Sequence, residues 1–247
     1  MILRRARPLL GTLVEIGVAE VAAADQAAAT AAIDAAFAVV ARLQRELSRF
    51  EPASEIGRFN ALPAGASLEV GNDAAIVLAA AQGLHAASDG LFDASCGSAP
   101  RGWRLHGRRL DKLEPRARLD LGGIAKGHGV DRAIEALLSA GCGAGWVNAG
   151  GDLRAFGAIE VPIVLRDEDG GGVRLFARLA DGAFCTSCRS TEPGRPLAGV
   201  SGRRGATHVS VAAPLCLWAD ALTKVVGLSG DAEHPLLARH GARSWVH

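Results

Sequence analysis

Aromatic residues are scarce in this sequence, which contains four Trp, seven Phe and no Tyr among its 247 residues. The hydrophobic fraction is nevertheless 49%, and much of it is alanine. A chain of this length and composition can bury a sizeable core. We therefore expect a globular protein with several helices and a core built largely from small side chains.

A strong charge of either sign is also missing. The formal net charge is +1, which argues against a nucleic-acid-binding protein driven by electrostatics. No segment reaches about 18 uninterrupted apolar residues, the length at which a membrane-spanning helix is expected. The sequence therefore predicts no nucleic-acid partner and no membrane span.

Cysteine is infrequent. The five cysteines are odd in number and widely spread, which is typical of reduced thiols in the cytoplasm. The N-terminal stretch MILRRARPLLGTLVEIGV has no persuasive signal-peptide cleavage site, and the apolar part that follows its basic residues is interpreted as a strand. The expected location is therefore cytoplasmic, with an exported form left open. Cys185 and Cys188 form a single C-x-x-C pair, and the sequence leaves open redox chemistry or two incidental buried residues.

Hydrophobic periodicity predicts helices and strands in mixed order. Helices are expected over 22–49, 74–87, 124–140 and 217–228. Strands are expected over 9–18, 119–121, 146–156, within 161–186, over 208–214 and over 242–247, with turns or loops over 100–118 and 189–206. Strands and helices do not alternate strictly, and no linker isolates a second core. We therefore expect an α+β fold, a single compact domain over 1–247 with mixed or antiparallel sheets packed against several helices.

The stretch RLDLGGIAKGHGVDRA (118–133) is rich in glycine but matches neither G-x-x-x-x-G-K-[ST] nor G-x-G-x-x-G. Its glycines lie where a strand is expected to become a helix, and a helix N-terminus can bind an anion. Lys126 could neutralise a phosphate there. The residues alone leave open a ligand site with Asp120 and Lys126, or a glycine-rich corner with a solvated lysine.

Two further stretches combine polar residues with unusual surroundings. Gly150 and Gly151 interrupt the strand expected over 146–156 and predict a bulge or a close backbone contact. Asp220 and Lys224 lie four residues apart in LWADALTKVV, so they share one helix face. An aspartate in so apolar a helix is costly unless it is paired or bound to a cation. A surface ion pair and a functional site both remain open.

Six segments resemble, in the same order, the motifs of the FAD:protein FMN transferase (ApbE-like) family. They are PLLGTLVEI (8–16), LSRFEPASEIGRFN (47–60), GLFDASCG (90–97), LDLGGIAKGHGVDRA (119–133), VNAGGDLRAFG (147–157) and VSVAAPLCLWADALTK (209–224). The resemblance covers nearly the whole chain. Leu10 stands where the family has methionine, and His128 stands where tyrosine is usual.

This resemblance implies an ApbE-like fold and an enzyme that binds FAD with a divalent cation, normally Mg²⁺. Such an enzyme transfers the FMN part to a threonine or serine hydroxyl of a partner flavoprotein and releases AMP. By resemblance, the residues expected to contact FAD are Leu10, Phe50, Phe92, Asp93, Asp120 and Lys126. The carbonyl of Gly123 and the carboxylate of Asp220 are expected to hold the metal, with Thr223 beside them.

Two departures from the family pattern bear on catalysis. The segment expected to carry a catalytic histidine is shortened, with Glu192–Pro196 as a remnant, and His208 is the only histidine in that region. Lys224 replaces the metal-binding threonine, and Thr223 lies one position early. Asp220, Lys224 and His208 are therefore the candidate catalytic residues, and we expect the Lys224 ammonium to weaken or replace metal binding. A flavin carrier without transfer activity, an FAD pyrophosphate hydrolase and a flavin-linked Cys185/Cys188 redox protein remain alternatives.

Overall fold

The computed structural model describes residues 1–166, 172–188 and 208–247. Its largest sheet has the strand order β1-β2-β6-β7-β10-β11-β12. These strands are β1 (Leu3–Leu9), β2 (Thr12–Val18), β6 (Gly145–Ala149), β7 (Asp152–Phe156), β10 (Gly182–Cys188), β11 (His208–Ala213) and β12 (Arg243–Val246). All neighbouring strands in it run antiparallel.

Two smaller sheets and the helices complete the described fold. The smaller sheets consist of β3 (Ser67–Glu69), β5 (Arg109–Lys112) and β4 (Trp103–His106), and of the hairpin β8 (Val161–Arg166) and β9 (Val173–Leu179). The helices are η1 (Ala23–Asp25), α1 (Gln26–Leu47), α2 (Glu55–Ala61), α3 (Asn72–Ala87), α4 (Ala125–Ser139), α5 (Cys216–Ser229) and α6 (Pro235–Arg239). The predicted α+β class, with antiparallel sheets packed against several helices, is confirmed.

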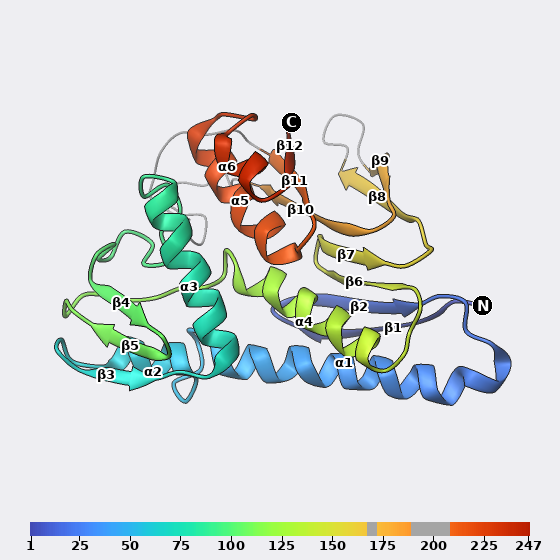
Figure 1. Cartoon of the computed structure of the whole chain (residues 1–247), viewed down its shortest axis with the longest axis horizontal. Coiled ribbons are helices and arrows are strands. Elements are labelled where there is room, and N and C mark those ends of the chain that lie inside the picture. The colour runs from blue at the N-terminus through green and yellow to red at the C-terminus, as the bar shows by residue number, and fades with distance from the viewer. Residues whose placement is uncertain (167–171, 189–207) are drawn as a thin grey trace.

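Around β10 the main sheet is covered on both faces, and the alternation of side chains along this strand shows how. Ala183 and Cys185 belong to the main core, which α1, α4 and α5 cover from one side (Figure 1). Phe184 between them points the other way and packs in a second apolar cluster with Trp146 and Ile163, against the β8–β9 hairpin. The sheet is thus a scaffold that holds α4 and α5 side by side on one face.

Most predicted helices are confirmed to within a few residues. α1 buries the apolar stripe that predicted it, including Ile33, Phe37, Val40 and Leu43. The segment Ala23–Leu47 is long and apolar enough to cross a membrane by length and composition alone, a test that a core helix also passes. In this fold its apolar stripe packs against α4, β1 and β2.

Other expectations were wrong in instructive ways. The segment expected as a loop over 100–118 contains the β4–β5 hairpin, which pairs with β3. The strand expected over 119–121 does not form, because the side chain of Asn60 takes the place of a partner strand. Its Nδ2 donates to the Leu119 carbonyl (3.0 Å), and its Oδ1 accepts from the Leu119 amide (2.7 Å).

The strand expected over 146–156 is a hairpin of β6 and β7. Its two-residue turn is Gly150–Gly151, with φ values of +63° and +104°. A Cβ added at Gly150 would lie 2.3 Å from the Thr12 hydroxyl, so both the backbone angle and the space require glycine there. The turn directs the chain so that Asp152 begins β7 beneath the first turn of α4.

Candidate functional site

A pocket of about 400 Å³ opens where the end of α1, the β1–β2 turn and the start of α4 meet. Its lining residues are Leu10, Gly11, Leu43, Gln44, Leu47, Ser48, Arg49, Phe50, Glu51, Asp120, Leu121, Gly122, Ala125 and Lys126. Four of the residues expected to bind a cofactor, Leu10, Phe50, Asp120 and Lys126, are among them. Segments far apart in the sequence therefore contribute to one cavity, as the resemblance implies.

Local backbone geometry shapes one wall of this pocket. Leu10 adopts a left-handed conformation (φ +54°) in the turn between β1 and β2, which is uncommon for a residue with a branched side chain. Its amide is held by the side chain of Gln44, whose Oε1 accepts at 2.6 Å. The helix α1 thus fixes the turn that brings Leu10 to the cavity.

The opposite wall carries an aromatic ring and an ion pair. The Phe50 side chain is exposed (77%), and the guanidinium of Arg49 lies 4.2 Å from its ring centroid. Arg49 Nε also contacts Asp120 Oδ2 at 2.9 Å. An exposed ring and an arginine at the rim of a cavity form a surface on which a planar heterocycle can stack.

Lys126 provides positive charge at the base of the pocket. Its Nζ donates to Asp152 Oδ2, and the Lys126 side chain is 29% exposed against 3% for Asp152. Burial alone would lower the pKa of Lys126, but the carboxylates of Asp152 and Asp220 outweigh it and raise the pKa above the usual lysine value. Lys126 therefore stays protonated, and a pocket wall with a fixed cation suits an anionic ligand such as a phosphate.

Asp220 and Lys224 form a buried ion pair on α5, not a surface pair. Lys224 Nζ donates to Asp220 Oδ1 and also lies 3.0 Å from the Asp220 carbonyl and 3.0 Å from Ser187 Oγ. The second carboxylate oxygen, Oδ2, accepts from the Gly127 amide at 3.2 Å. A Cβ at Gly127 would lie 2.3 Å from the Cys216 carbonyl, so a glycine is required where α4 and α5 approach.

The two neighbouring carboxylates differ in their titration. Burial alone would raise the pKa of Asp220, but the ammonium groups of Lys224 and Lys126 outweigh it and lower the pKa. The pKa of Asp152 is raised by burial and by the negative charge of Asp220. Asp220 is thus the more firmly ionised of the two, and Asp152 depends on Lys126 for its charge.

The position of α5 depends on a residue that the sequence did not single out. Asp131 on α4 accepts from the backbone amides of Cys216 and Leu217, both at 2.9 Å, and from Arg154 Nη1 at 2.7 Å. These two amides are the first of α5 and have no partner within the helix. The contact joins residues 85 and 86 positions apart, so no local pattern could have revealed it.

Some predicted site residues lie elsewhere. Phe92 and Asp93 are buried and are not among the residues lining the pocket. The Asp93 carboxylate accepts from the Ser95 amide (2.8 Å), the Ser95 hydroxyl (2.9 Å) and the Gly97 amide (2.8 Å). In this structure Asp93 therefore fixes the loop that follows α3.

Two of the predicted metal ligands, Asp220 and Thr223, lie together on α5, and their oxygens are already hydrogen-bonded. Thr223 Oγ1 donates to the Asp220 carbonyl at 2.6 Å and contacts Ser187 Oγ at 2.7 Å. Gly123 is buried at the start of α4. In the described part of the chain, no group of three or more His, Cys, Asp or Glu side chains could hold a metal ion. Mg²⁺ is usually held by one or two carboxylates together with waters and substrate phosphates. Here the Asp220 carboxylate is already paired with the Lys224 ammonium, so the residues present do not fit Mg²⁺.

His208, the candidate general base, begins β11 and is half-buried. Its carbonyl accepts from the His247 amide at 3.0 Å, and it is not among the residues lining the pocket. The Glu192–Pro196 remnant lies outside the described residues. Cys185 is buried with its sulfur 3.4 Å from that of Cys216, whereas the Cys188 side chain is not described.

A second pocket of about 240 Å³ lies where the β6–β7 turn meets the β8 strand. Thr186 is part of its lining, and its hydroxyl contacts Ser210 Oγ at 2.8 Å, which in turn lies 3.1 Å from His247 Nε2. Because Thr186 and Ser187 are adjacent on β10, they point to opposite faces of the sheet. This pocket is therefore separate from the Asp220–Lys224 pair.

Comparison with known proteins places this geometry in context. The sequence model that describes the ApbE family of proteins matches residues 10–110 and 104–244 of this chain. A comparison with curated protein sequences finds no significant match.

Several solved structures share the fold. The flavin transferase ApbE from Vibrio cholerae has a TM-score of 0.81 at 20% identity, covering 100% of this chain and 93% of its own. An ApbE protein from Thermotoga maritima has a TM-score of 0.82 at 23% identity, with 100% and 94% covered. The apo form of flavinyl transferase ApbE from Pseudomonas stutzeri has a TM-score of 0.80 at 21% identity, with 99% and 90% covered. At these identities the likeness establishes the fold.

Proposed function

Because the chain belongs to the ApbE family, we propose that it is a flavin transferase that uses FAD as its substrate. It transfers the FMN part to a threonine or serine hydroxyl of an acceptor flavoprotein and releases AMP. The observation that carries this proposal is the pocket that unites Leu10, Phe50, Asp120 and Lys126. An exposed ring and a fixed ammonium in one cavity suit a ligand with a planar heterocycle and a pyrophosphate.

The pocket residues have distinct roles in this proposal. Phe50 and Arg49 stack against a ring of the substrate at the rim. Lys126 neutralises the pyrophosphate at the base, held in place by Asp152. A volume of about 400 Å³ is in the range of small-molecule pockets, and we expect it to hold one part of the dinucleotide with the rest extending along α4.

The transfer step exchanges one phosphorus–oxygen bond for another. The acceptor hydroxyl oxygen attacks the phosphorus on the FMN side, and the bond from that phosphorus to the bridging oxygen breaks. AMP leaves with the bridging oxygen, and the hydroxyl proton passes to a base. The sequence candidate for this base is His208, the only histidine between residues 187 and 209. Its place on β11 puts it on the Thr186 face of the sheet, opposite Ser187 and the Asp220–Lys224 pair, so the His208→Ala variant decides whether it takes the proton. Lys126 would offset the charge that builds on the bridging oxygen.

Two products distinguish the proposal from its alternatives. The protein is incubated with FAD and an acceptor flavoprotein fragment; AMP is measured by chromatography and bound flavin by in-gel fluorescence. The matched control is the same acceptor with its target threonine replaced by alanine. We expect AMP and labelled acceptor in equal amounts, and neither with the control acceptor. AMP without labelling would indicate an FAD hydrolase, and FAD binding without AMP would indicate a flavin carrier.

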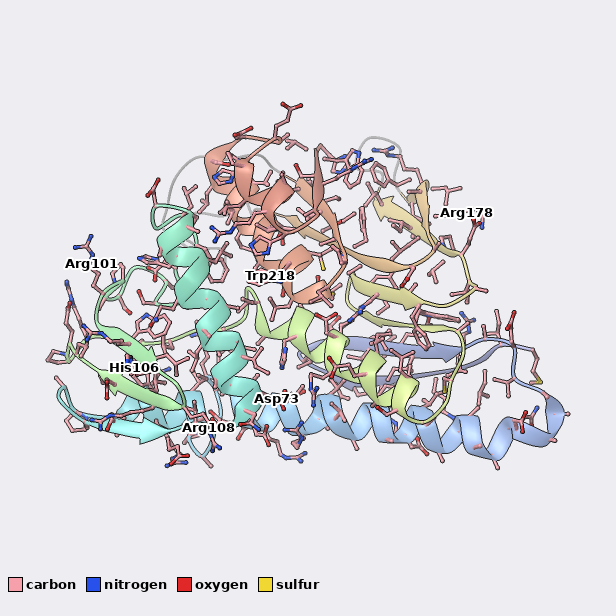
Figure 2. The ribbon with its side chains drawn as sticks, viewed as in Figure 1. Asp73, Arg101, His106, Arg108, Arg178 and Trp218 are labelled. Atoms are coloured by element: carbon pink, nitrogen blue, oxygen red, sulfur yellow. The ribbon has the colours of Figure 1, made fainter. Side chains whose placement is uncertain are left out.

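The base can be tested separately. Loss of a general base typically lowers the rate by about 10² to 10⁴, so His208→Ala should slow AMP release by that factor while FAD binding, measured by fluorescence quenching, persists. His106→Ala is the matched control, since this exposed histidine lies on β4 in the smaller sheet (Figure 2). Equal rates for the two variants would assign the proton to another group.

A further inference from the structure

Four charged side chains meet where α4, β7 and α5 come together. Lys126 contacts Asp152, and Lys224 contacts Asp220. Asp152, Asp220 and Lys224 are buried, with 2%, 0% and 7% exposure. With both carboxylates ionised, the two ammonium groups balance them and the cluster has no net charge. A buried cluster of this kind needs no further cation for neutrality.

Both carboxylate oxygens of Asp220 take part in bonds within the cluster. One carboxylate oxygen accepts from Lys224 and the other from the Gly127 amide. Lys224 in turn has three N–H donors and three acceptors around it, namely Asp220 Oδ1, the Asp220 carbonyl and Ser187 Oγ. The ammonium is therefore fully hydrogen-bonded where it stands. A metal ion at Asp220 would have to share the carboxylate with this ammonium.

The use of lysine across the chain supports a specific role. Of the 27 lysine and arginine residues in the sequence, only three are lysines, namely Lys112, Lys126 and Lys224. Lys112 is also buried and donates to the Asn60 carbonyl at 3.0 Å. Lysine thus occurs only where a compact cation makes hydrogen bonds inside the protein. An arginine, with its planar fork of donors, is not interchangeable with lysine at such a site.

We propose that the Lys224 ammonium is the resident cation of this site, and that the chain binds its flavin dinucleotide without a divalent metal ion at Asp220. The first half concerns the protein alone, and the second half rests on the proposed function. A divalent ion added to the intact cluster would face the ammonium across the shared carboxylate, where like charges repel. Lys224→Thr would leave Asp152 and Asp220 with only Lys126, a net charge of −1, and the site would then attract a cation.

Mn²⁺ binding tests the first half without any flavin. Free Mn²⁺ is measured by electron paramagnetic resonance while it is titrated into the wild-type protein and into Lys224→Thr, Asp220→Asn and the Lys224→Thr/Asp220→Asn double variant. We expect no stoichiometric uptake by the wild type, one ion per chain for Lys224→Thr, and loss of that ion in the double variant. Lys112→Met, which removes the other fully buried lysine, should take up no ion.

The wild type alone can overturn the proposal. One Mn²⁺ per wild-type chain that Asp220→Asn abolishes would show that Asp220 holds a metal in spite of Lys224. This comparison remains decisive where Lys224→Thr fails to fold, as judged by circular dichroism. Failure of folded Lys224→Thr to bind Mn²⁺ would also contradict the proposal, because the charge argument requires a cation there.

Flavin binding tests the second half. The dissociation constant of FAD, measured by fluorescence quenching, should change by less than about twofold for the wild type between EDTA and excess Mg²⁺, a difference of under about 0.4 kcal/mol. For Lys224→Thr the same exchange should change it by tenfold or more, about 1.4 kcal/mol. A tenfold Mg²⁺ effect on the wild type would overturn this half. Absence of FAD binding under every condition would refute the proposed function, while the Mn²⁺ result would still stand.

Discussion

The two ends of the Lys126–Asp152 pair are buried to different extents, and this difference predicts which end matters more for stability. The Lys126 side chain is 29% exposed, against 3% for Asp152. Removing the lysine leaves a buried carboxylate beside Asp220, whereas removing the carboxylate leaves an ammonium that water can reach. Breaking a buried pair typically costs about 3 to 5 kcal/mol. Lys126→Met should reach that range, and Asp152→Asn should cost less.

Urea unfolding monitored by circular dichroism checks this order of effects. Lys126→Met/Asp152→Asn should recover part of the loss, because no uncompensated charge remains. Arg116→Met is the control: the Arg116 side chain is 77% exposed in its pair with Glu114, and exposed pairs are worth about 0 to 1 kcal/mol. A larger loss for Asp152→Asn than for Lys126→Met would contradict this account of the pair.

At the scale of single elements, α5 begins without a side-chain cap of its own. Its N-cap residue Leu215 supplies none, and Asp131 of α4 accepts from the first two amides instead. Asparagine has nearly the same shape but one acceptor oxygen, so Asp131→Asn should lose one of these bonds and the ion pair with Arg154. The expected loss is about 1 to 2 kcal/mol, the range for helix caps, and Asp131→Ala should lose more.

The consequence should extend to the site, because α5 carries Asp220 and Lys224. We expect Asp131→Asn to weaken FAD binding measured by fluorescence quenching, although Asp131 is not among the pocket's lining residues. Ser54→Ala provides the matched control, since Ser54 caps the short helix α2 by accepting from Gly57 at 2.8 Å. Full FAD affinity in folded Asp131→Asn would show that α5 keeps its place without this cap.

Asp73 links three helices and makes their packing depend on pH. At the start of α3 (Figure 2) it accepts from Arg42 of α1 at 2.9 Å, forms an ion pair with Arg132 of α4 at 3.1 Å, and contacts His128 of α4 at 2.9 Å. Burial alone would raise the pKa of Asp73, but the hydrogen bonds from His128 and Arg42 outweigh it and lower the pKa. A carboxylate whose pKa is lowered by folding stabilises the native state above its unfolded pKa, about 3.9.

This stabilisation should be complete at pH 7 and should disappear as the pH falls through the lowered pKa of the folded state. Asp73→Asn should therefore cost roughly 1.5 to 3 kcal/mol at pH 7, the range for hydrogen bonds to charged groups, and less below about pH 4. Urea unfolding of both proteins at a series of pH values measures the difference. A difference that stays constant or grows as the pH falls would contradict this assignment.

The sequence predicted those elements whose stability is encoded locally. The stripe of Ile33, Phe37, Val40 and Leu43 indicates α1 without reference to the rest of the chain. β1 carries no such signal, because its five central residues are exposed and the strand exists through pairing with β2. Residues 119–121 show the opposite case, a strand predicted from the local sequence that does not form. The backbone groups of Leu119 bond to the Asn60 side chain instead of a neighbouring strand.

The candidate functional site also divides into residues that local motifs indicate and contacts that only the fold creates. Leu10, Phe50, Asp120 and Lys126 could be named from motifs by resemblance, and they meet in one pocket. The bonds that fix the site, from Asp152 to Lys126 and from Asp131 to α5, join residues 26 and 85 positions apart. Periodicity and propensity do not describe contacts at that separation. Lys224 was visible as a departure, but its three acceptors could be found only in the fold.

At the scale of the whole molecule, one apolar core extends from Val14 on β2 to Ala242 beside β12. It includes Leu110 of the β3–β5–β4 sheet as well as Val211 of the main sheet, although Figure 1 shows the three-stranded sheet at the left, apart from the main sheet. Cooperativity requires shared buried contacts rather than proximity in sequence. We therefore propose that residues 1–247 form one domain that unfolds in a single transition.

Differential scanning calorimetry measures this directly, because a two-state transition has equal calorimetric and van't Hoff enthalpies. Leu110→Ala makes the test sharper. Leu110 is fully buried on β5 in the β3–β5–β4 sheet. Truncating a buried leucine to alanine typically lowers the free energy of unfolding by about 2 to 5 kcal/mol. In a single cooperative unit the whole transition should move to lower temperature and keep its shape.

In a molecule of two units, only the part containing β3, β4 and β5 would shift, and the peak would split. A split peak would also imply that the pocket, formed by α1, β1, β2 and α4, survives melting of the smaller sheet, so that FAD would stabilise only the later of the two transitions.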